Sequence, residues 1–197
     1  LGKQYRDDGL RMTWIAPTEE LLVEAGVEVL RGDTYPGGGN SGDLGDVKHG
    51  FIHIGGDVGD SSSWQLGISH MDIDVVERTS GGHAHGADAE GPTFGGDSDL
   101  SAIDFVWKSE FPSGRKLILQ GEYFLRDEDG QVTLSEDAGD ALFNYDGKQS
   151  GWYAQGIFQF APQWRTGIRY DRLDADNKLA MVSNANGESD DDIFEES

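Results

Sequence analysis

Residues 151–172 show a strict alternation of apolar and polar positions on both sides of a short turn, Ala161-Pro162-Gln163. A period of two is typical of β-strands, whereas an amphipathic helix repeats its apolar positions every three or four residues. The run on each side of the turn is long enough to cross a hydrocarbon layer at a tilt. The stretch therefore predicts a membrane-spanning β-hairpin, whose apolar face is formed by Trp152, Ala154, Gly156, Phe158, Phe160, Trp164, Thr166, Ile168 and Tyr170.

The same alternation recurs in three further pairs of runs upstream. Their short turns lie near residues 16–20, 59–63 and 111–115, where Pro, Gly, Asp and Ser favour a reversal of the chain. With the turn at 161–163, the chain is predicted to form eight strands in four hairpins. Residues 19–30 also contain good helix formers, but Gly26 and the unbroken apolar row from Leu21 to Val29 favour a strand.

The connections between these strands alternate between short and long. The long ones, residues 31–48, 72–99, 127–148 and 174–197, are rich in Gly, Asp and Asn and are interpreted as loops. Up-and-down outer-membrane barrels have this asymmetry, while a soluble sandwich has no reason to keep its long loops at one end. We therefore expect residues 1–197 to form one all-β segment, an antiparallel up-and-down transmembrane β-barrel of about eight strands that is part of a larger barrel.

Tryptophan positions support the same interpretation. One Trp lies near each short turn, on the predicted lipid-facing side of its strand. Amphipathic rings collect at the boundary between lipid headgroups and acyl chains, although Trp can also close the end of a soluble core. We expect a girdle at one rim that is formed by Trp14, Trp64, Trp107 and Trp164. Trp152 is expected at the opposite rim.

Composition narrows the class of protein. The chain has 197 residues, 36% hydrophobic residues, no Cys and a formal charge of -22. No run approaches the roughly 18 consecutive apolar residues of a membrane helix, while a barrel strand exposes only every second residue to lipid. The opening residues do not resemble a signal peptide, and residues 189–197 are acidic where a closing strand is expected. We therefore expect an internal fragment.

Several segments are similar to a known family: residues 4–14, Gly55-Gly56-Asp57-Val58-Gly59, and residues 151–156 with 164–171. They resemble the middle of a proteobacterial family of porin-like outer-membrane proteins, often described as zinc-regulated outer-membrane receptors or porins. The resemblance implies a larger barrel in the bacterial outer membrane and a link to metal supply. It also implies the lipid bilayer and lipopolysaccharide as partners.

Acidic residues are concentrated in the long connections. Residues 72–99, 127–148 and 174–197 hold 7, 7 and 8 acidic residues, with one basic residue each. Such loops can simply be solvated, or they can attract divalent cations to a pore mouth and bind cations that bridge lipopolysaccharide phosphates. Zinc and calcium are the candidate ions. Nucleic acid is excluded as a partner, because this field repels phosphate.

A candidate metal site lies in the loop at 72–99. His83 and His85 are separated by one residue, and Asp88 and Glu90 follow closely. Imidazole nitrogens with nearby carboxylates suit zinc or another transition ion, although a His-x-His in a glycine-rich loop can be incidental. His49 and His70 are expected at the external rim.

Polar residues that alternate with the apolar rows are expected to line a hydrated lumen, since mixed charge is costly against lipid. No catalytic motif is present, so no enzymatic activity is expected. The predicted function is a porin-like channel or receptor for small solutes, including metal ions. The alternatives are a non-conducting structural or adhesin-like β-protein and a soluble acidic β-sandwich. The predicted lumen residues are Arg11, Glu24, Glu28, His53, Asp57, Asp104, Lys108, Glu122, Arg165, Arg169 and Asp171.

Overall fold

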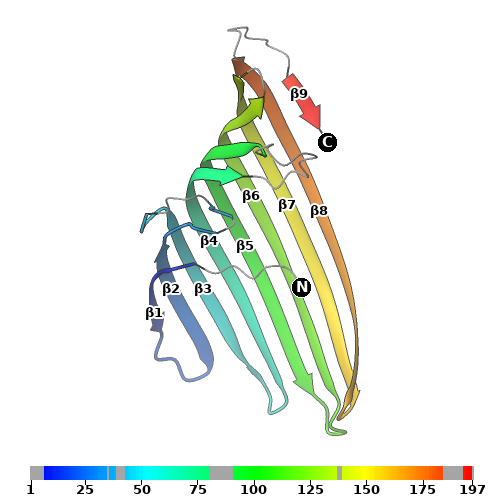
Figure 1. The fold of residues 1–197 in the computed structure, drawn as a ribbon. Helices are drawn as coiled ribbons and strands as arrows, with labels where there is room; N and C mark the ends of the chain where they lie inside the picture. The colour runs from blue at the N-terminus through cyan, green and yellow to red at the C-terminus, as the bar shows by residue number, and fades with distance from the viewer. Residues whose placement is uncertain are drawn as a thin grey trace.

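The computed structural model describes residues 7–34, 36–38, 43–79, 91–136, 139–183 and 193–196, which form one antiparallel sheet. The nine strands follow one another in chain order, so each pairs with its neighbours in sequence (Figure 1). The all-β, up-and-down prediction is confirmed. The strands are β1 (Gly9–Ile15), β2 (Leu21–Leu30), β3 (Val47–Val58), β4 (Ser62–Thr79), β5 (Thr93–Glu110), β6 (Lys116–Glu136), β7 (Gly139–Ala161), β8 (Trp164–Ser183) and β9 (Ile193–Glu196).

Short turns join the strands at one end of the sheet (Figure 1). They connect β1 to β2, β3 to β4, β5 to β6 and β7 to β8, at the four predicted places. Gly59 and Gly114 adopt positive φ values of 62° and 76°, a conformation that favours glycine. Measured from these turns, the strands lengthen across the sheet, from 7 residues in β1 to 23 in β7.

The sheet is open, so the described strands do not close into a barrel by themselves. β1 pairs with β2 alone, and β9 lies at the opposite edge beside β8. A sheet closes into a barrel when its two edges match in length and register. Here one edge is β1, with 7 residues, and most of the other edge is β8, with 20 residues, so the edges do not match in length.

In three of the four predicted long loops the described residues are mostly strand, and the loop interpretation was wrong for these residues. β4 and β5 continue to Thr79 and back from Thr93, and β6, β7 and β8 cover most of 127–148 and 174–183. The alternation of side chains persists in these segments, but the apolar residues change to the other face. Only the connection between β2 and β3, residues 31–46, is a long loop within the described part of these four regions.

The sheet has two faces, called inner and outer. The inner face carries Glu24, Glu28 and His53, and the outer face carries Trp14, Ile52 and Ile68. Cross-strand pairs keep each set on its own side through β1 to β5. The parts of β4 to β8 beyond the cross-strand row Asp72–Asp99–Asp127–Lys148–Asp176 form the turn-distal half of the sheet, and the rest is the turn-proximal half.

The buried core lies on the inner face around the start of the turn-distal half. Its members are contributed by β2 to β5, with partly buried neighbours from β4, β6 and β7. The loop at 31–46 covers this core: Pro36 and Gly37 are buried, and Arg78 donates a hydrogen bond of 2.8 Å to the Pro36 carbonyl. The core residues are Leu30, Val47, Ile73, Val75 and Phe94.

The described residues contain no helix that is long and apolar enough to cross a membrane.

Candidate functional site

The inner face of the turn-proximal half brings the predicted lumen residues together. Arg11 lies opposite Glu28, which lies opposite His49 on the next strand. Further along, Asp104 and Glu122 face each other, and Tyr153 and Asp171 continue that row. By this register, all eleven polar residues singled out from the sequence lie on one face.

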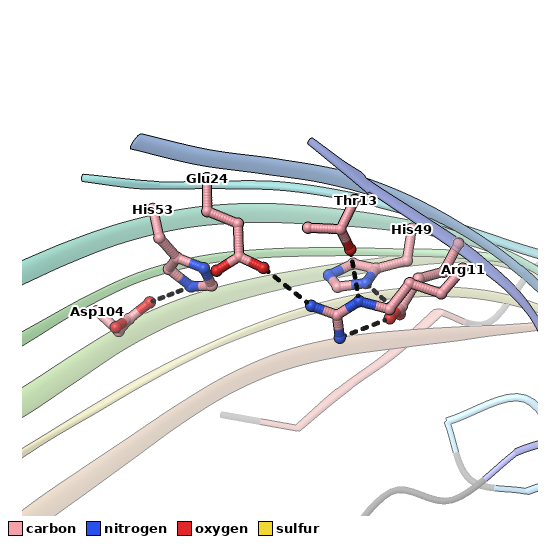
Figure 2. A network of polar contacts seen from close by, with 7 residues as sticks. Arg11, Thr13, Glu24, His49, His53 and Asp104 are labelled. Atoms are coloured by element: carbon pink, nitrogen blue, oxygen red, sulfur yellow. Dashed lines mark hydrogen bonds and ion pairs between the residues drawn. The ribbon is translucent and has the colours of Figure 1, made fainter. Parts of the chain in front are cut away.

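A network of charges joins the first three strands (Figure 2). One carboxylate oxygen of Glu28 lies 2.8 Å from His49 Nδ1, within hydrogen-bonding distance. The other oxygen lies 3.1 Å from a guanidinium nitrogen of Arg11. Arg11 also reaches Glu24 at 3.5 Å and donates to the Thr13 hydroxyl at 3.1 Å. Glu28 is thus the central acceptor, with 17% of its side chain exposed.

An aromatic ring lies within this network. Phe51 stacks on His49 on one side and contacts His53 on the other, with ring centroids 5.6 Å and 5.1 Å apart. The Arg11 guanidinium carbon lies 4.6 Å from the Phe51 centroid, in cation–π geometry. Gly26, the cross-strand partner of Phe51, leaves the necessary room, because a Cβ there would overlap the ring. His53 extends the network to Asp104 at 3.9 Å.

The opposite side of the inner face is held by β7 and β8. Arg169 donates a hydrogen bond of 2.6 Å to Asp171, and its guanidinium carbon lies 3.8 Å from the centroid of the Tyr153 ring. Asp171 is therefore the carboxylate partner of Arg169. Lys108 and Arg165 line a hollow of about 590 Å³ at the turn end of the inner face, together with Asp57.

A buried ion cluster in the turn-distal half was not anticipated from the sequence. Glu128 lies between Arg78, at 2.7 Å, and Arg126, and its side chain is only 3% exposed. Arg126 also donates to the Ser98 hydroxyl at 3.3 Å. Arg78 lies over the Phe94 ring, with 4.7 Å from its guanidinium carbon to the centroid. The loop interpretation of residues 72–99 and 127–148 hid this cluster.

His49 and His70, both expected at an external rim, lie on opposite faces of the sheet. His49 lies on the inner face against Glu28, because β3 begins at Val47 and alternation from His53 back to His49 keeps both on the same side. His70 lies on the outer face, where its ring accepts from or donates to the Ser101 hydroxyl at 2.9 Å. Extending the period of two to the start of β3 would have found His49.

Metal binding receives no geometric support in the described residues, where no group of three or more His, Asp or Glu is placed to hold an ion. The predicted ligands His83, His85, Asp88 and Glu90 lie outside the described residues. The zinc and calcium expectations therefore stay predictions.

The outer face changes from apolar to polar along the strands. On β6 its residues are Leu117, Leu119, Gly121, Tyr123 and Leu125, followed by Asp127, Asp129 and Gln131. The inner face of β6 changes in the opposite sense, from Gln120 and Glu122 to Val132 and Leu134. The neighbouring strands repeat the reversal: on the boundary row, Asp72, Asp99 and Lys148 face outward, and beyond it Ile73, Phe94 and Tyr145 face inward.

The four turn-proximal Trp residues lie on the outer face, at the turn end of their strands. Trp64 and Trp107 are direct cross-strand partners. Trp14 belongs to the cross-strand row that reaches β4 at Ile68, four residues from Trp64 along that strand. Trp164 lies four residues closer to the turns than Ile168, which shares the row of Trp64. The Trp positions therefore shift by about one residue for each strand step on average, with no shift between β4 and β5. At the other edge, Trp152 and Tyr170 contact each other with centroids 5.3 Å apart.

On the outer face of β8, Arg172 is the first charged residue after the turn. Arg172 donates hydrogen bonds to Asp174, the shorter being 2.8 Å.

No protein-family profile matches the chain, and no solved structure matches it. The chain is similar to a protein of Aquifex aeolicus (strain VF5) that is described only as uncharacterized, with 31% identity over 186 residues. The match covers 88% of this chain and 37% of that protein. The chain thus spans about 37% of the length of the curated relative it matches.

Proposed function

We propose that this chain is part of the wall of a porin-like β-barrel in a bacterial outer membrane, which lets small hydrophilic solutes cross. The observation that carries the proposal is the reversal of polarity along the strands. In the turn-proximal half the outer face is apolar and the inner face polar, and in the turn-distal half the two are exchanged. Lipid around the first half and water around the second would account for both.

The outer face of the turn-proximal half supports a lipid environment because its large apolar residues are uncovered. Ile168 is 79% exposed, Met12 72% and Trp164 67%. Contiguous exposed apolar patches of this kind are rare on monomeric soluble proteins and mark sites of protein or membrane contact. No second layer covers this face within the described residues.

The length of the apolar run fits the thickness of a membrane. On β6 the run extends from Leu117 to Leu125. At about 3.3 Å per residue, these nine positions span about 26 Å along the strand. A strand tilted by about 40° then covers roughly 20 Å of membrane, near the height of the apolar band of outer-membrane barrels.

The Trp residues give an independent measure of that tilt. If they mark one membrane boundary, the boundary shifts by about one residue for each step from strand to strand. A rise of about 3.3 Å against a strand spacing of about 4.8 Å corresponds to a tilt of about 35°. Barrel strands tilt by 35–45°, so the girdle and the barrel geometry agree.

Other strands must complete such a barrel. Most of β8, from Trp164 to Asp176, has no partner on its second side among the described residues, and neither does β1. The Aquifex relative is considerably longer than the region matched by this chain. We propose that further strands of a longer protein pair with both edges.

The inner face supports passage of hydrophilic solutes because it carries mixed charges. Its acids, including Glu24, Asp57 and Asp104, can concentrate cations, and Arg165 can attract anions. A preference for metal ions rests on the sequence resemblance and on the His83–His85 loop. Acidic side chains on the turn-distal outer face would lie outside the membrane near the lipid headgroups.

Planar-bilayer recordings of the complete protein test the channel. Discrete conductance steps that change when inner-face charges such as Glu28 are neutralised are expected. The second candidate is a non-conducting barrel, which the packed core on the inner face favours, since Val47 and Ile73 are 0% and 2% exposed. Stable insertion into bilayers without conductance would decide for that candidate. A monodisperse, folded monomer in water without detergent would exclude both.

A further inference from the structure

The hollow at the turn end of the inner face contains a pair of cations that the charge network does not use. Among the described inner-face cations, Arg11, Lys116 and Arg169 each have a carboxylate partner. Lys108 and Arg165 make no ion pair or hydrogen bond in the part of the chain that the structure describes, although both line this hollow. In a protein with a formal charge of -22, two such cations in one hollow indicate a place for an anion.

Cross-strand register places an apolar floor between the two cations. Lys108 on β5 lies opposite Ile118, which lies opposite Ile157, and the row ends at Gly167 on β8. Arg165 is two residues from Gly167 on the same face. Three strand steps separate Lys108 from Gly167, or about 14 Å between backbones. The long Lys and Arg side chains can therefore reach a small molecule that lies over the two Ile residues.

We propose that this hollow binds a small organic carboxylate. Arg165 would bind the carboxylate in bidentate fashion, and Lys108 would add a second, compact positive charge. Ile118 and Ile157 would contact the carbon chain, which a hydrated inorganic anion lacks. Gln159 and Ser63, which also line the hollow, offer uncharged hydrogen-bonding groups.

The acids of the hollow limit the size and charge of this ligand. Glu110, the third acid that lines the hollow, is paired with Lys116 at 3.0 Å. Asp57, near the end of β3, and Asp60, in the turn that follows, lie on the side of Lys108 opposite to β8. Their charges would repel an extended polyanion that reached that end. The site therefore selects a short carboxylate near β5 to β8, within a volume of about 590 Å³.

Isothermal titration calorimetry of the full chain in detergent tests the site, with butyrate as the probe. Butyrate should bind, its neutral analogue butyramide should not, and the double variant Lys108→Gln/Arg165→Gln should bind about tenfold more weakly or not at all. The matched control is Lys148→Gln/Lys178→Gln, which removes the same charge from the outer face and should leave the affinity unchanged. Circular dichroism verifies that each variant keeps its sheet, and the two single substitutions replace any double variant that does not fold.

Unchanged butyrate affinity in the Lys108 and Arg165 variants would overturn the assignment, as would equal binding of butyramide. Binding of inorganic phosphate without butyrate would overturn the choice of a carboxylate. The test requires only the folded sheet in detergent. A protein that binds butyrate at this site but forms no channel in bilayers would therefore retain this inference while losing the proposed function.

Discussion

The two halves of the sheet use the same strands for opposite purposes. In the turn-proximal half, β6 directs Leu119 outward and Glu122 inward, and in the turn-distal half it directs Asp129 outward and Val132 inward. Backbone geometry does not change at the boundary, since β6 and β7 stay paired from Lys116 to Glu136. The comparison teaches that alternation gives the two faces of a strand, while the surroundings decide which face is apolar.

The largest effect is expected for carboxylates on the inner face, one in each half. Glu128→Gln removes the negative charge between two buried guanidiniums and should lower the free energy of unfolding by about 3–5 kcal/mol. Glu28→Gln, in the more exposed network, should cost about 1 kcal/mol. Urea unfolding in detergent measures both. Equal losses would mean that the turn-distal half is as hydrated as the other.

The outer face offers the next test, on a single strand. Ala154 lies at mid-height of the apolar run on β7, and Asn144 lies on the same face in the turn-distal half; both are exposed. In lipid vesicles Ala154→Arg should cost about 2–4 kcal/mol, because a cation at the middle of the bilayer loses its hydration. Asn144→Arg should change stability by less than about 0.5 kcal/mol. If both substitutions are tolerated equally in lipid, the outer face does not contact acyl chains.

Glycine substitutions probe the packing of the turn-proximal inner face. Gly26→Ala places a Cβ against the Phe51 ring and should cost about 1–3 kcal/mol by displacing the ring from Arg11 and the two His residues. Gly50→Ala, on the adjacent strand and the outer face, meets nothing within 4 Å and should be nearly neutral. Thermal unfolding followed by circular dichroism compares them. A harmless Gly26→Ala would show that Phe51 is not held in this position.

The smallest signal is spectroscopic and concerns the boundary at the turns. A variant that keeps Trp64 and carries Phe at the other Trp positions should be quenched best by lipids brominated close to the headgroup. Lipids brominated at the chain end should quench it less. Quenching by aqueous iodide alone would place Trp64 in water and would contradict a Trp girdle at a membrane boundary.

Much of the fold was predictable because it depends on local patterns. The four short turns, the antiparallel order and the face of each turn-proximal residue follow from a period of two and from Pro, Gly and Asp at the reversals. Arg11, Glu24 and Glu28 could be assigned to one face in this way, and the structure joins them in one network. The metal ligands proposed at His83 and His85 are untested by the structure.

The extent of the strands was not predictable in the same way. A search for apolar residues on the outer face of β6 ends before Asp127, Asp129 and Gly130, which are typical of a loop. These residues nevertheless continue β6, with polar residues on the outer face and apolar residues on the inner face. The buried cluster of Arg78, Arg126 and Glu128 depends on residues about fifty positions apart, which only strand pairing brings together. A sequence pattern carries no information about such distant partners.

The sequence by itself determined the alternation, the turns and hence an antiparallel meander, because each depends on residues a few positions apart. Tertiary structure alone decided that the sheet stays open, that the loop at 31–46 covers an inward core, and that Lys108 and Arg165 share one hollow. These features depend on the register and curvature of many strands together, and on which side chains neighbouring strands place beside them.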